Sequence, residues 1–375
     1  MCELMKEPRK LLRFEVQVAE HCNLKCINCN HFAPLAKNQF LDIENYTRDC
    51  ERLSVLFGAE IEFINLMGGE PLLHPQIIDI MKITRKNFQR GEIRLVTNGL
   101  LLSDMKQEFW GACKANRIEL HITKYPVNLD YTYIEKEASL NGVYLDYYGG
   151  GDRNRMLRLP IDLSGKFDPA DNFRRCTWGN FWITLCGNGR LYTCTKAACA
   201  HHLKDYFNLD MELDEQNSVD IYKVNSADEL MQKLAKPIPF CRYCDLSVWN
   251  EYEDNWQISS KDKYEWVSFT YSKEDIQYLK NISKVYIFGA GGWGTATVRR
   301  LTDKGIKITA ILVSSKKNNK DSIDHIPVIE LEQLDTPDKN DVCILALKGK
   351  VKSEIQSILY QKGFKRLIPL LHEQE

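Results

Sequence analysis

Three cysteines lie close together near the start of the chain, in the sequence Cys22-Asn-Leu-Lys-Cys26-Ile-Asn-Cys29. Four thiolates would saturate every iron of a [4Fe–4S] cluster, whereas three leave one iron with an open position that can chelate a small molecule. A zinc knuckle is the alternative, but zinc sites favour repeated C-x2-C pairs and four ligands. The C-x3-C-x2-C spacing therefore predicts an iron–sulfur cluster with one open iron.

A second motif, Met67-Gly68-Gly69-Glu70-Pro71, follows further along the chain. Its glycines allow the backbone to approach a ligand closely, and Glu70 can accept charge-assisted hydrogen bonds from an ammonium group. Alone, this motif is an ordinary turn with a solvated glutamate. Together with the three cysteines it resembles the cluster and amino-group sites of radical S-adenosylmethionine (SAM) enzymes.

The resemblance covers roughly residues 12–250 and implies that Cys22, Cys26 and Cys29 hold a [4Fe–4S] cluster whose open iron binds SAM. In that family the cluster passes one electron to SAM and yields a 5′-deoxyadenosyl radical, and a flavodoxin- or ferredoxin-type protein supplies the electron. The resemblance also implies a set of SAM-binding residues, which are Gly68, Gly69, Glu70, Thr97, Asn98 and Lys124. For Thr97, Asn98 and Lys124 the alternative is simple turn or cap chemistry.

Four later cysteines, Cys176, Cys194, Cys241 and Cys244, resemble those of the twitch domain, a shortened relative of the SPASM domain of radical SAM enzymes. This resemblance implies one auxiliary [4Fe–4S] cluster with four thiolate ligands, and structural zinc is the alternative. A fully ligated cluster has no open iron for SAM, but it can accept an electron from a substrate radical.

Two further cysteines, Cys186 and Cys199, lie in the same segment. Epimerases of the family quench a substrate radical with a cysteine hydrogen atom, which is one reading of these thiols. Free cysteines are commonly just small buried apolar residues, which is the other. The histidines His74, His121, His201 and His202 have no spacing that marks a metal site.

The C-terminal part of the chain resembles a nucleotide-binding unit. A strand pattern from Lys284 runs into Gly289-Ala-Gly291-Gly-Trp-Gly294 and then a helix, a setting in which G-x-G-x-x-G holds a pyrophosphate at the helix N-terminus. The next strand ends in Ser314-Ser315-Lys316-Lys317 in place of the acidic residue that binds a ribose diol, which disfavours NAD(P). The unit also resembles the nucleotide-sugar-binding domain of sugar acyltransferases, which implies a nucleotide at Gly289, Gly291 and Gly294. A structural or dimerising role is the alternative.

The elements that position these motifs alternate in type over the first part of the chain. Apolar runs predict strands at Leu12–Ala19, Ile61–Met67, Ile93–Thr97, Ile118–Thr123 and Val143–Tyr148, and amphipathic patterns predict helices at Asp42–Phe57, Pro75–Phe88, Asp104–Ala115 and Tyr131–Leu140. Such repeats form parallel strands covered by helices. Because loops at the carboxyl ends of barrel strands build active sites, we expect the first cysteine motif and Glu70 at one end of a barrel.

We therefore predict an α/β fold with three domains and a linker. These are a partial (β/α)6 radical SAM barrel over residues 1–165, a small β-hairpin and helix twitch domain over 166–255, a linker over 256–283 and a Rossmann-like domain over 284–375. The hairpin is expected at Phe181–Cys186 and Arg190–Thr195, because Gly187-Asn188-Gly189 between them is a turn signal.

The composition excludes several classes of function. The chain has 375 residues, enough for two or three domains, and a formal net charge of −1, which gives no electrostatic footprint for nucleic acid. No apolar run approaches the roughly 18 residues of a membrane span. Thirteen cysteines with no apparent secretion signal are typical of metal ligands and buried thiols in a reducing cytoplasm.

These patterns predict a cytoplasmic radical SAM enzyme that oxidises, epimerises or dehydrates a sugar or nucleotide-linked sugar. The segment Cys29-Asn-His31-Phe-Ala-Pro-Leu-Ala36 resembles radical SAM proteins of bacterial polysaccharide synthesis, and the whole architecture is similar to that of enzymes acting on aminocyclitols. Arg153, Arg155 and Arg158 suit phosphate or carboxylate recognition, with a solvated basic turn as the alternative.

Two other functions remain open from the sequence. Peptide modification, as in many SPASM enzymes, is one, but only about eleven residues precede the first strand, so we expect no leader-peptide-binding domain at that end. The other is a non-catalytic nucleotide-binding iron–sulfur protein, which the intact cysteine and glycine motifs disfavour.

Overall fold

The computed structural model describes residues 6–9, 12–58, 61–246, 253–270, 272–317, 319–347 and 351–369. Parts of the expected domains, including residues 1–5, 247–252 and 370–375, lie outside the described residues. The chain divides into two compact units, the first comprising Met1–Asn154, Leu163–Leu246 and Trp256–Ile258, and the second Arg155–Asp162, Ser247–Asn255 and Ser259–Glu375.

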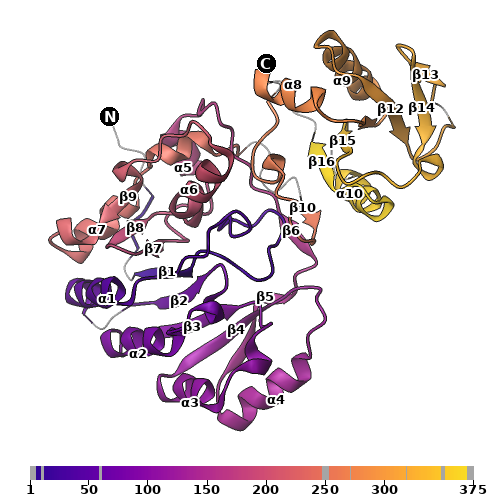
Figure 1. Ribbon diagram of the computed structural model, residues 1–375. Coiled ribbons are helices and arrows are strands. Elements are labelled where there is room, and N and C mark those ends of the chain that lie inside the picture. The colour runs from indigo at the N-terminus through magenta and orange to yellow at the C-terminus, as the bar shows by residue number, and fades with distance from the viewer. Residues whose placement is uncertain are drawn as a thin grey trace. The chain divides into compact units, whose positions relative to one another are not determined.

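The first unit is built on the five predicted parallel strands. These are β1 (Arg13–Ala19), β2 (Phe63–Gly68), β3 (Glu92–Thr97), β4 (Ile118–Lys124) and β5 (Leu145–Asp152), and each pairs in parallel with the next. Between them run α1 (Ile43–Phe57), α2 (Ile77–Asn87), α3 (Gln107–Ala115) and α4 (Tyr131–Asn141). Figure 1 shows these helices along one side of the strands. The predicted mixed α/β fold with a parallel strand–helix sheet is confirmed.

Alternation along β1 separates the two faces of this sheet. Phe14, Val16 and Val18 are buried in an apolar core that also contains Tyr46 of α1 and Ile80 of α2. Since successive side chains of a strand point to opposite faces, the polar residues between them lie on the face away from the helices. Glu15 and Gln17, which lie on this face, are themselves buried.

The sixth parallel strand comes from the predicted hairpin. β7 (Thr184–Cys186) pairs in parallel with β1 and antiparallel with β8 (Arg190–Tyr192), which pairs with β9 (Ser218–Asp220). The sheet order is therefore β5-β4-β3-β2-β1-β7-β8-β9. The hairpin, expected in a domain of its own, extends the barrel sheet at the edge of β1, where unpaired backbone groups need partners.

The rest of the cysteine-bearing region is helical. Its elements are α5 (Pro169–Arg175), α6 (Thr195–Phe207), α7 (Ala227–Leu234) and the short 3-10 helix η5 (Pro239–Tyr243). Asp168 caps α5 by accepting a hydrogen bond from the Asp171 N–H at 2.7 Å, and Cys194 occupies the N-cap position of α6. Because Cys176 occupies the C-cap position of α5, Cys176 and Cys194 both sit at the ends of helices, where the turns set their positions.

The second unit contains a sheet with the order β13-β14-β12-β11-β15-β16. Its strands are β11 (Val285–Phe288), β12 (Ile308–Val313), β13 (Ser322–Ile323), β14 (Ile326–Glu330), β15 (Val342–Leu345) and β16 (Arg366–Pro369), with helices α9 (Gly292–Asp303) and α10 (Val351–Lys362). All pairs except β13 with β14 are parallel. The parallel strands run 3-2-1-4-5 in order of appearance, an arrangement in which ligands bind where the order reverses.

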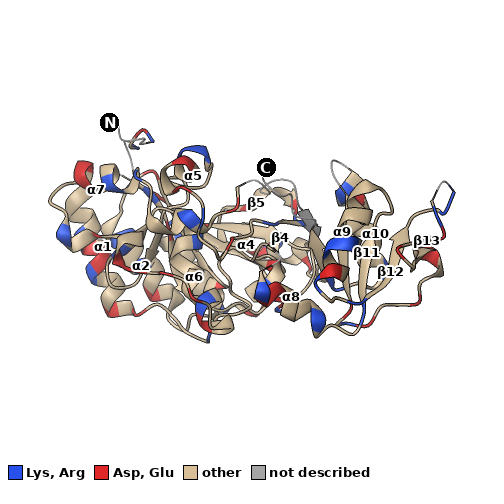
Figure 2. Cartoon of the chain, turned by 90° about the horizontal axis from the view of Figure 1, so that it is seen from above, with Lys and Arg blue, Asp and Glu red and all other residues tan. Residues whose placement is uncertain are grey.

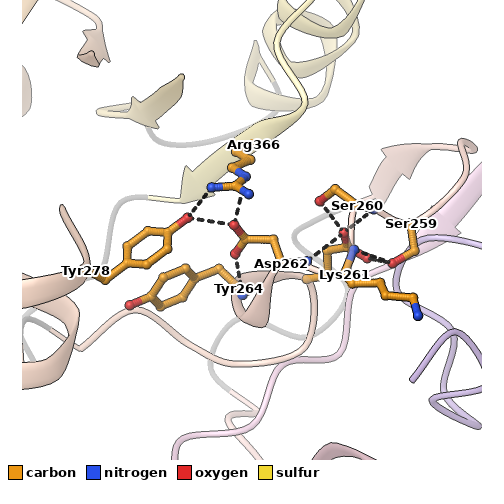
Figure 3. A network of polar contacts seen from close by, with 8 residues as sticks. Ser259, Ser260, Lys261, Asp262, Tyr264, Tyr278 and Arg366 are labelled. Atoms are coloured by element: carbon orange, nitrogen blue, oxygen red, sulfur yellow. Dashed lines mark hydrogen bonds and ion pairs between the residues drawn. The ribbon is translucent and has the colours of Figure 1, made fainter. Parts of the chain in front are cut away.

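The segment predicted as a linker is an integral part of the second unit, apart from residues 256–258. Asp262 forms an ion pair with Arg366 of β16 at 3.1 Å and accepts a hydrogen bond from the Tyr278 hydroxyl of α8 (Lys273–Lys280) at 2.6 Å (Figure 3). Residues 155–162, expected in the barrel, also belong to this unit, where β6 (Arg155–Leu157) pairs with β10 (Glu253–Asn255). Buried polar contacts between distant residues, which leave no local pattern, create this arrangement.

Replacing Asp262 by alanine is expected to destabilise the second unit. The change leaves the Arg366 guanidinium and the Tyr278 hydroxyl without their shared acceptor, and breaking a buried ion pair costs ~3 kcal/mol. Urea unfolding followed by tyrosine and tryptophan fluorescence measures the change in free energy. Asp324→Ala is the matched control, because Asp324 pairs with Arg299 at an exposed position. Equal midpoints for the two variants would contradict the role assigned to Asp262.

Charged residues of both signs are interspersed over the helices of both units (Figure 2). This mixture agrees with the formal net charge of −1. Within the described ranges, no helix combines the length and the apolar character that crossing a membrane requires.

Candidate functional site

The first three cysteines lie on the loop of residues 20–33, which leaves the carboxyl end of β1 and is called here the cysteine loop. Lys25, Asn28 and Phe32 adopt left-handed backbone conformations, with φ of 54°, 54° and 51°. Such conformations are uncommon outside glycine, and three of them curl the loop tightly. The curled loop thereby brings Cys22, Cys26 and Cys29 closer together than an extended chain would.

The cysteine loop brings its three thiols within electrostatic range of one another. Burial, reinforced by the nearby charges of Glu70 and Cys29, raises the pKa of the Cys22 thiol to about 12. Burial also raises the pKa of Cys26, and Cys29 and Cys22 add to the effect. A neutral thiol is therefore favoured at each position unless a cation compensates the charge.

The loop also supplies hydrogen-bond donors to the sulfur atoms. The Leu24 backbone N–H donates to Cys22 Sγ at 3.3 Å, and the N–H groups of His31, Phe32 and Ala33 donate to the Cys29 sulfur. Hydrogen bonds of this kind stabilise the thiolates of an iron–sulfur cluster. The residues present therefore fit a cluster held by three thiolates.

Glu70, at the end of β2, is almost completely buried. Its Oε1 accepts hydrogen bonds from the Thr97 hydroxyl at 2.7 Å and the Leu72 N–H at 3.1 Å, and its Oε2 accepts one from the Asn98 N–H at 2.9 Å. Burial raises the pKa of this carboxyl to about 7, although all three hydrogen bonds lower it. A carboxylate has about four acceptor positions, so these partners leave capacity for one further donor.

Gly68 and Gly69 bring the ends of β1 and β2 into close contact. A Cβ on Gly68 would lie 2.5 Å from the Ala19 carbonyl oxygen, and one on Gly69 would lie 2.0 Å from that of His21. Gly69 N–H donates to Ala19 at 2.7 Å and Glu70 N–H donates to His21 at 3.0 Å. The glycines thus fix the distance between Glu70 and the cysteine loop, a role in addition to the ligand approach expected from the sequence.

Thr97 and Asn98, at the end of β3, lie beside Glu70 and the first cysteine. The Asn98 amide Nδ2 is 3.6 Å from Cys22 Sγ and donates to Asn23 Oδ1 at 2.7 Å. The structure therefore brings these two predicted residues to the site, where they orient Glu70 and the cysteine loop.

Lys124 has a different set of partners. Its ammonium group lies 3.4 Å from an Asp152 carboxylate oxygen and 5.0 and 5.3 Å from the ring centres of Tyr131 and Tyr147. The neighbouring Tyr125 instead hydrogen-bonds to the Cys26 thiol. At the end of β4 it is thus the tyrosine, which sequence reasoning missed, that contacts the cysteine loop.

The four later cysteines also converge. Burial raises the pKa of Cys194 to about 12, with charges of Cys241 and Cys176 contributing. Burial also raises the pKa of Cys244 well above its usual value, and the charges of the other three cysteines add to this effect. The Trp178 and Gly179 N–H groups donate to Cys176 Sγ at 3.3 and 3.4 Å. The four thiols therefore lie within electrostatic range of one another, and backbone N–H groups donate to one of them.

Two lysines adjoin these four cysteines. Lys6 Nζ donates to the carbonyl oxygens of Cys176 and Gly179, the latter at 3.0 Å, and Lys196 follows Cys194 on α6 and is 2 % exposed. Burial lowers the pKa of Lys196, while the charges of Cys244 and Cys194 raise it. Neither lysine carried a signal in the sequence, because its proximity depends on long-range contacts.

Cys186 and Cys199 lie on the inner side of the same region. Burial raises the pKa of Cys199 well above its usual value, and Cys186, Glu20 and Cys29 reinforce this. Glu20 pairs with His202 at 2.7 Å, and despite burial the hydrogen bond from His202 holds the pKa of Glu20 below its usual value. Glu20, His201 and His202 form a group whose potential metal-ligand atoms lie within 4.8 Å of one another. The sequence spacing of these histidines marked no metal site there.

The three predicted arginines are divided between the units. Arg153 belongs to the first unit, where its N–H donates to the Lys124 carbonyl at 2.7 Å. Arg155 and Arg158 belong to the second unit, and Arg158 is buried and donates to the Leu367 carbonyl at 3.3 Å. The recognition of a phosphate or carboxylate by these arginines stays a prediction.

The glycine turn of the second unit lies between β11 and α9. A Cβ on Gly294 would lie 1.8 Å from the Gly289 carbonyl oxygen, so this glycine permits close packing of helix and strand, whereas a Cβ on Gly291 would meet nothing within 4 Å. Glu330, at the end of β14, accepts a hydrogen bond from the Lys316 N–H at 2.6 Å. A carboxylate thus approaches the end of β12 from the neighbouring strand, although β12 itself lacks the acidic residue.

Comparison with known proteins finds matches to the part of the chain that carries the cysteine loop and Glu70. Residues 16–153 match the model of the radical SAM superfamily. The chain is 32% identical over 136 residues to a GTP 3′,8-cyclase of Peptoclostridium acidaminophilum, covering 36% of this chain and 41% of the relative. It is 35% identical over 101 residues to a probable GTP 3′,8-cyclase of Methanothermobacter marburgensis, covering 26% and 30%. The chain thus spans less than half the length of these relatives.

Two solved structures are similar in part. One is BtrN in complex with AdoMet and 2-DOIA, with a TM-score of 0.38 and 14% identity, covering 70% of this chain and 100% of that one. The other is anSMEcpe with bound AdoMet, with a TM-score of 0.39 and 15% identity, covering 61% and 84%.

The matched residues include the cysteine loop, the glycines before Glu70 and the ends of β1 to β4, which are the parts that converge in the structure. A protein of this family binds a [4Fe–4S] cluster and SAM, and the three thiols fit that cluster. Residues 16–153 are therefore the part of this chain that matches the radical SAM superfamily.

Proposed function

We propose that this radical SAM enzyme takes a hydrogen atom from a sugar or nucleotide-linked sugar, leading to its oxidation, epimerisation or dehydration. The observation that carries the radical chemistry is the convergence of Cys22, Cys26 and Cys29 with buried Glu70. In this proposal the three cysteines ligate the cluster and Glu70 accepts a hydrogen bond from the SAM amino group. When bound, the cluster and SAM supply a 5′-deoxyadenosyl radical.

The inner face of the barrel sheet supports a substrate rich in hydroxyl groups. Glu15 on β1, Asn65 on β2 and Arg94 on β3 lie in register across this face. Among the described residues, the Asn65 amide is fully buried and neither its oxygen nor its nitrogen has a hydrogen-bond partner. A buried amide without partners costs about 1–3 kcal/mol. A hydroxyl group both donates and accepts, and so it can satisfy such an amide.

The second cysteine set supports an oxidative outcome within this proposal. Cys176, Cys194, Cys241 and Cys244 supply four ligands to an auxiliary [4Fe–4S] cluster, which leaves no iron open for SAM. In this proposal the auxiliary cluster accepts an electron from the substrate radical. Cys199, close to Cys29 and Cys186, is the candidate hydrogen donor if the outcome is epimerisation instead.

The second unit supports a nucleotide-linked substrate or effector. In this proposal it is a Rossmann-like domain, and the open backbone at Gly291 with the first turn of α9 receives the phosphates. Gly289 and Gly294 close the turn on which that approach depends. A protein reductant of the flavodoxin or ferredoxin type supplies the electrons.

Anaerobic reconstitution followed by metal counting and assay of SAM cleavage tests the proposal. We expect about eight irons per chain, four for each cluster, and 5′-deoxyadenosine formation that nucleotide sugars or aminocyclitols stimulate. Peptides and GTP complete the panel. Four irons with one zinc would overturn the auxiliary cluster, stimulation by peptides or GTP alone would overturn the sugar substrate, and the absence of SAM cleavage would overturn the enzyme function.

The affinity for SAM is expected to fall as the pH is lowered through about 7, the value to which burial raises the Glu70 pKa. Below that pH the neutral acid accumulates and is a weaker acceptor for the hydrogen bond from the SAM amino group, so the affinity for SAM falls by up to roughly tenfold per pH unit. Equilibrium binding of SAM to the reconstituted protein measures this dependence.

Glu70→Gln is expected to bind SAM weakly at every pH and to abolish the dependence. The control is Glu108→Gln, because Glu108 is an exposed residue of α3. A Glu70→Gln variant that keeps the wild-type pH profile would assign the titration to another group.

A further inference from the structure

The short segment Trp256–Ile258 belongs to the first unit although the residues on both sides of it belong to the second. It runs along the cysteine loop, where the Ile27 N–H donates to the Gln257 carbonyl at 2.9 Å and Cys26 forms an isolated β-bridge with Ile258. At its other end the Trp256 N–H donates to the Asn154 carbonyl at 2.8 Å. The segment is therefore fixed by backbone hydrogen bonds directly beside the second cysteine.

These backbone contacts aim one side chain at the cluster site. The indole Nε1–H of Trp256 donates to Cys26 Sγ at 3.1 Å. The Tyr125 hydroxyl hydrogen-bonds to the same sulfur, and the rings of Tyr125 and Trp256 lie with their centres 6.0 Å apart. Cys26 thus receives two side-chain donors, from the end of β4 and from a segment 230 positions away in sequence.

An N–H donor at a ligating sulfur affects the two oxidation states of a cluster unequally. Reduction adds one negative charge, part of which resides on the thiolates, and a hydrogen bond to a charged acceptor is stronger than one to a neutral acceptor. The reduced state is therefore stabilised more than the oxidised state, which raises the reduction potential. An indole donates through Nε1–H only, so its contribution can be removed without changing charge.

We propose that Trp256 is a positioning residue for the radical SAM cluster, which holds the Cys26 sulfur by its indole N–H and raises the reduction potential of that cluster. The proposal rests on the function proposed above, in which Cys26 is a cluster ligand. It assigns a role in SAM cleavage to a residue outside the matched radical SAM region, in a segment that the sequence predicted as a linker.

Trp256→Phe keeps an aromatic ring and removes the donor. In EPR-monitored redox titrations of the reconstituted full-length protein, we expect the equilibrium constant for reduction of the SAM-binding cluster to fall by up to roughly tenfold, or ~59 mV for a one-electron couple. The SAM-binding cluster is recognised as the one whose EPR signal changes when SAM is added. The matched control, Trp293→Phe, makes the same change at an exposed tryptophan of α9 in the second unit and is expected to leave the potential unchanged.

A second measurement needs no variant. Pulsed EPR of the reduced wild-type protein labelled with [indole-15N]tryptophan is expected to show a nitrogen coupling in the SAM-sensitive signal. An unchanged potential in Trp256→Phe with full iron content overturns the proposal, and so does the absence of that coupling in the wild type. If the wild type itself binds no SAM-sensitive cluster, it is the proposed function that fails.

Discussion

Replacing Cys26 by serine is expected to abolish formation of 5′-deoxyadenosine. The cysteine loop gathers three thiols, and the buried thiol of Cys199 lies within electrostatic range of one of them, Cys29. A serine hydroxyl does not ionise at neutral pH and so leaves the cluster with two thiolates. We expect loss of about four of the roughly eight irons and SAM cleavage at background level, measured by iron analysis and chromatography of the products.

Two other cysteine variants separate this effect from unfolding. Cys113→Ala changes a buried thiol of α3 that lies 3.9 Å from Met81 Sδ in the apolar core, and it is expected to keep full iron and full SAM cleavage. Cys241→Ser is expected to lose the auxiliary irons while SAM cleavage is spared more than product formation. A Cys26→Ser protein that still cleaves SAM would show that Cys26 is not a ligand.

Replacing Gly69 by alanine is expected to reduce SAM cleavage by roughly a hundredfold or more, because displacement of a reacting group by about 1 Å can cost that much. The added methyl group would lie 2.0 Å from the His21 carbonyl oxygen, and neither backbone can yield without moving the cysteine loop away from Glu70. Iron content and the rate of 5′-deoxyadenosine formation measure the outcome.

Gly111→Ala is the matched control for this change. Gly111 lies in α3, where an added Cβ meets nothing within 4 Å, and alanine is favoured over glycine in a helix by about 0.5–1 kcal/mol. This variant is expected to retain activity with equal or greater stability. Wild-type SAM cleavage by Gly69→Ala would mean that the ends of β1 and β2 can separate without cost.

Local chemistry explains why much of this architecture could be predicted. The strand β3 was expected at Ile93–Thr97 and occurs at Glu92–Thr97, and the helix α1 was expected at Asp42–Phe57 and occurs at Ile43–Phe57. Both predictions depend on the spacing of apolar residues and on caps such as Asp42, which accepts a hydrogen bond from the Asn45 N–H. These signals act over a few residues and are therefore legible in the sequence.

The pairing of distant strands is a different matter. The hairpin at β7 and β8 was expected from its glycine turn, but its attachment to β1 depends on which sheet edge is unpaired when the chain folds. The segment around Asp262 was expected to be a linker because nothing in its own pattern announces the ion pair with Arg366. Contacts between residues so far apart in the sequence are set by the geometry of the whole unit.

By itself the sequence determined which groups are available for chemistry. The spacing of Cys22, Cys26 and Cys29 and the glycines before Glu70 resemble the motifs of radical SAM enzymes, and residues 16–153 match that superfamily. Thiol number and backbone freedom can be read in this way because they are properties of the residues themselves. Only the tertiary structure decided what surrounds that chemistry. Trp256 meets Cys26, and Asn98 meets Cys22, because parallel strand ends share one edge of a sheet and a returning segment can lie against them whatever its distance along the chain.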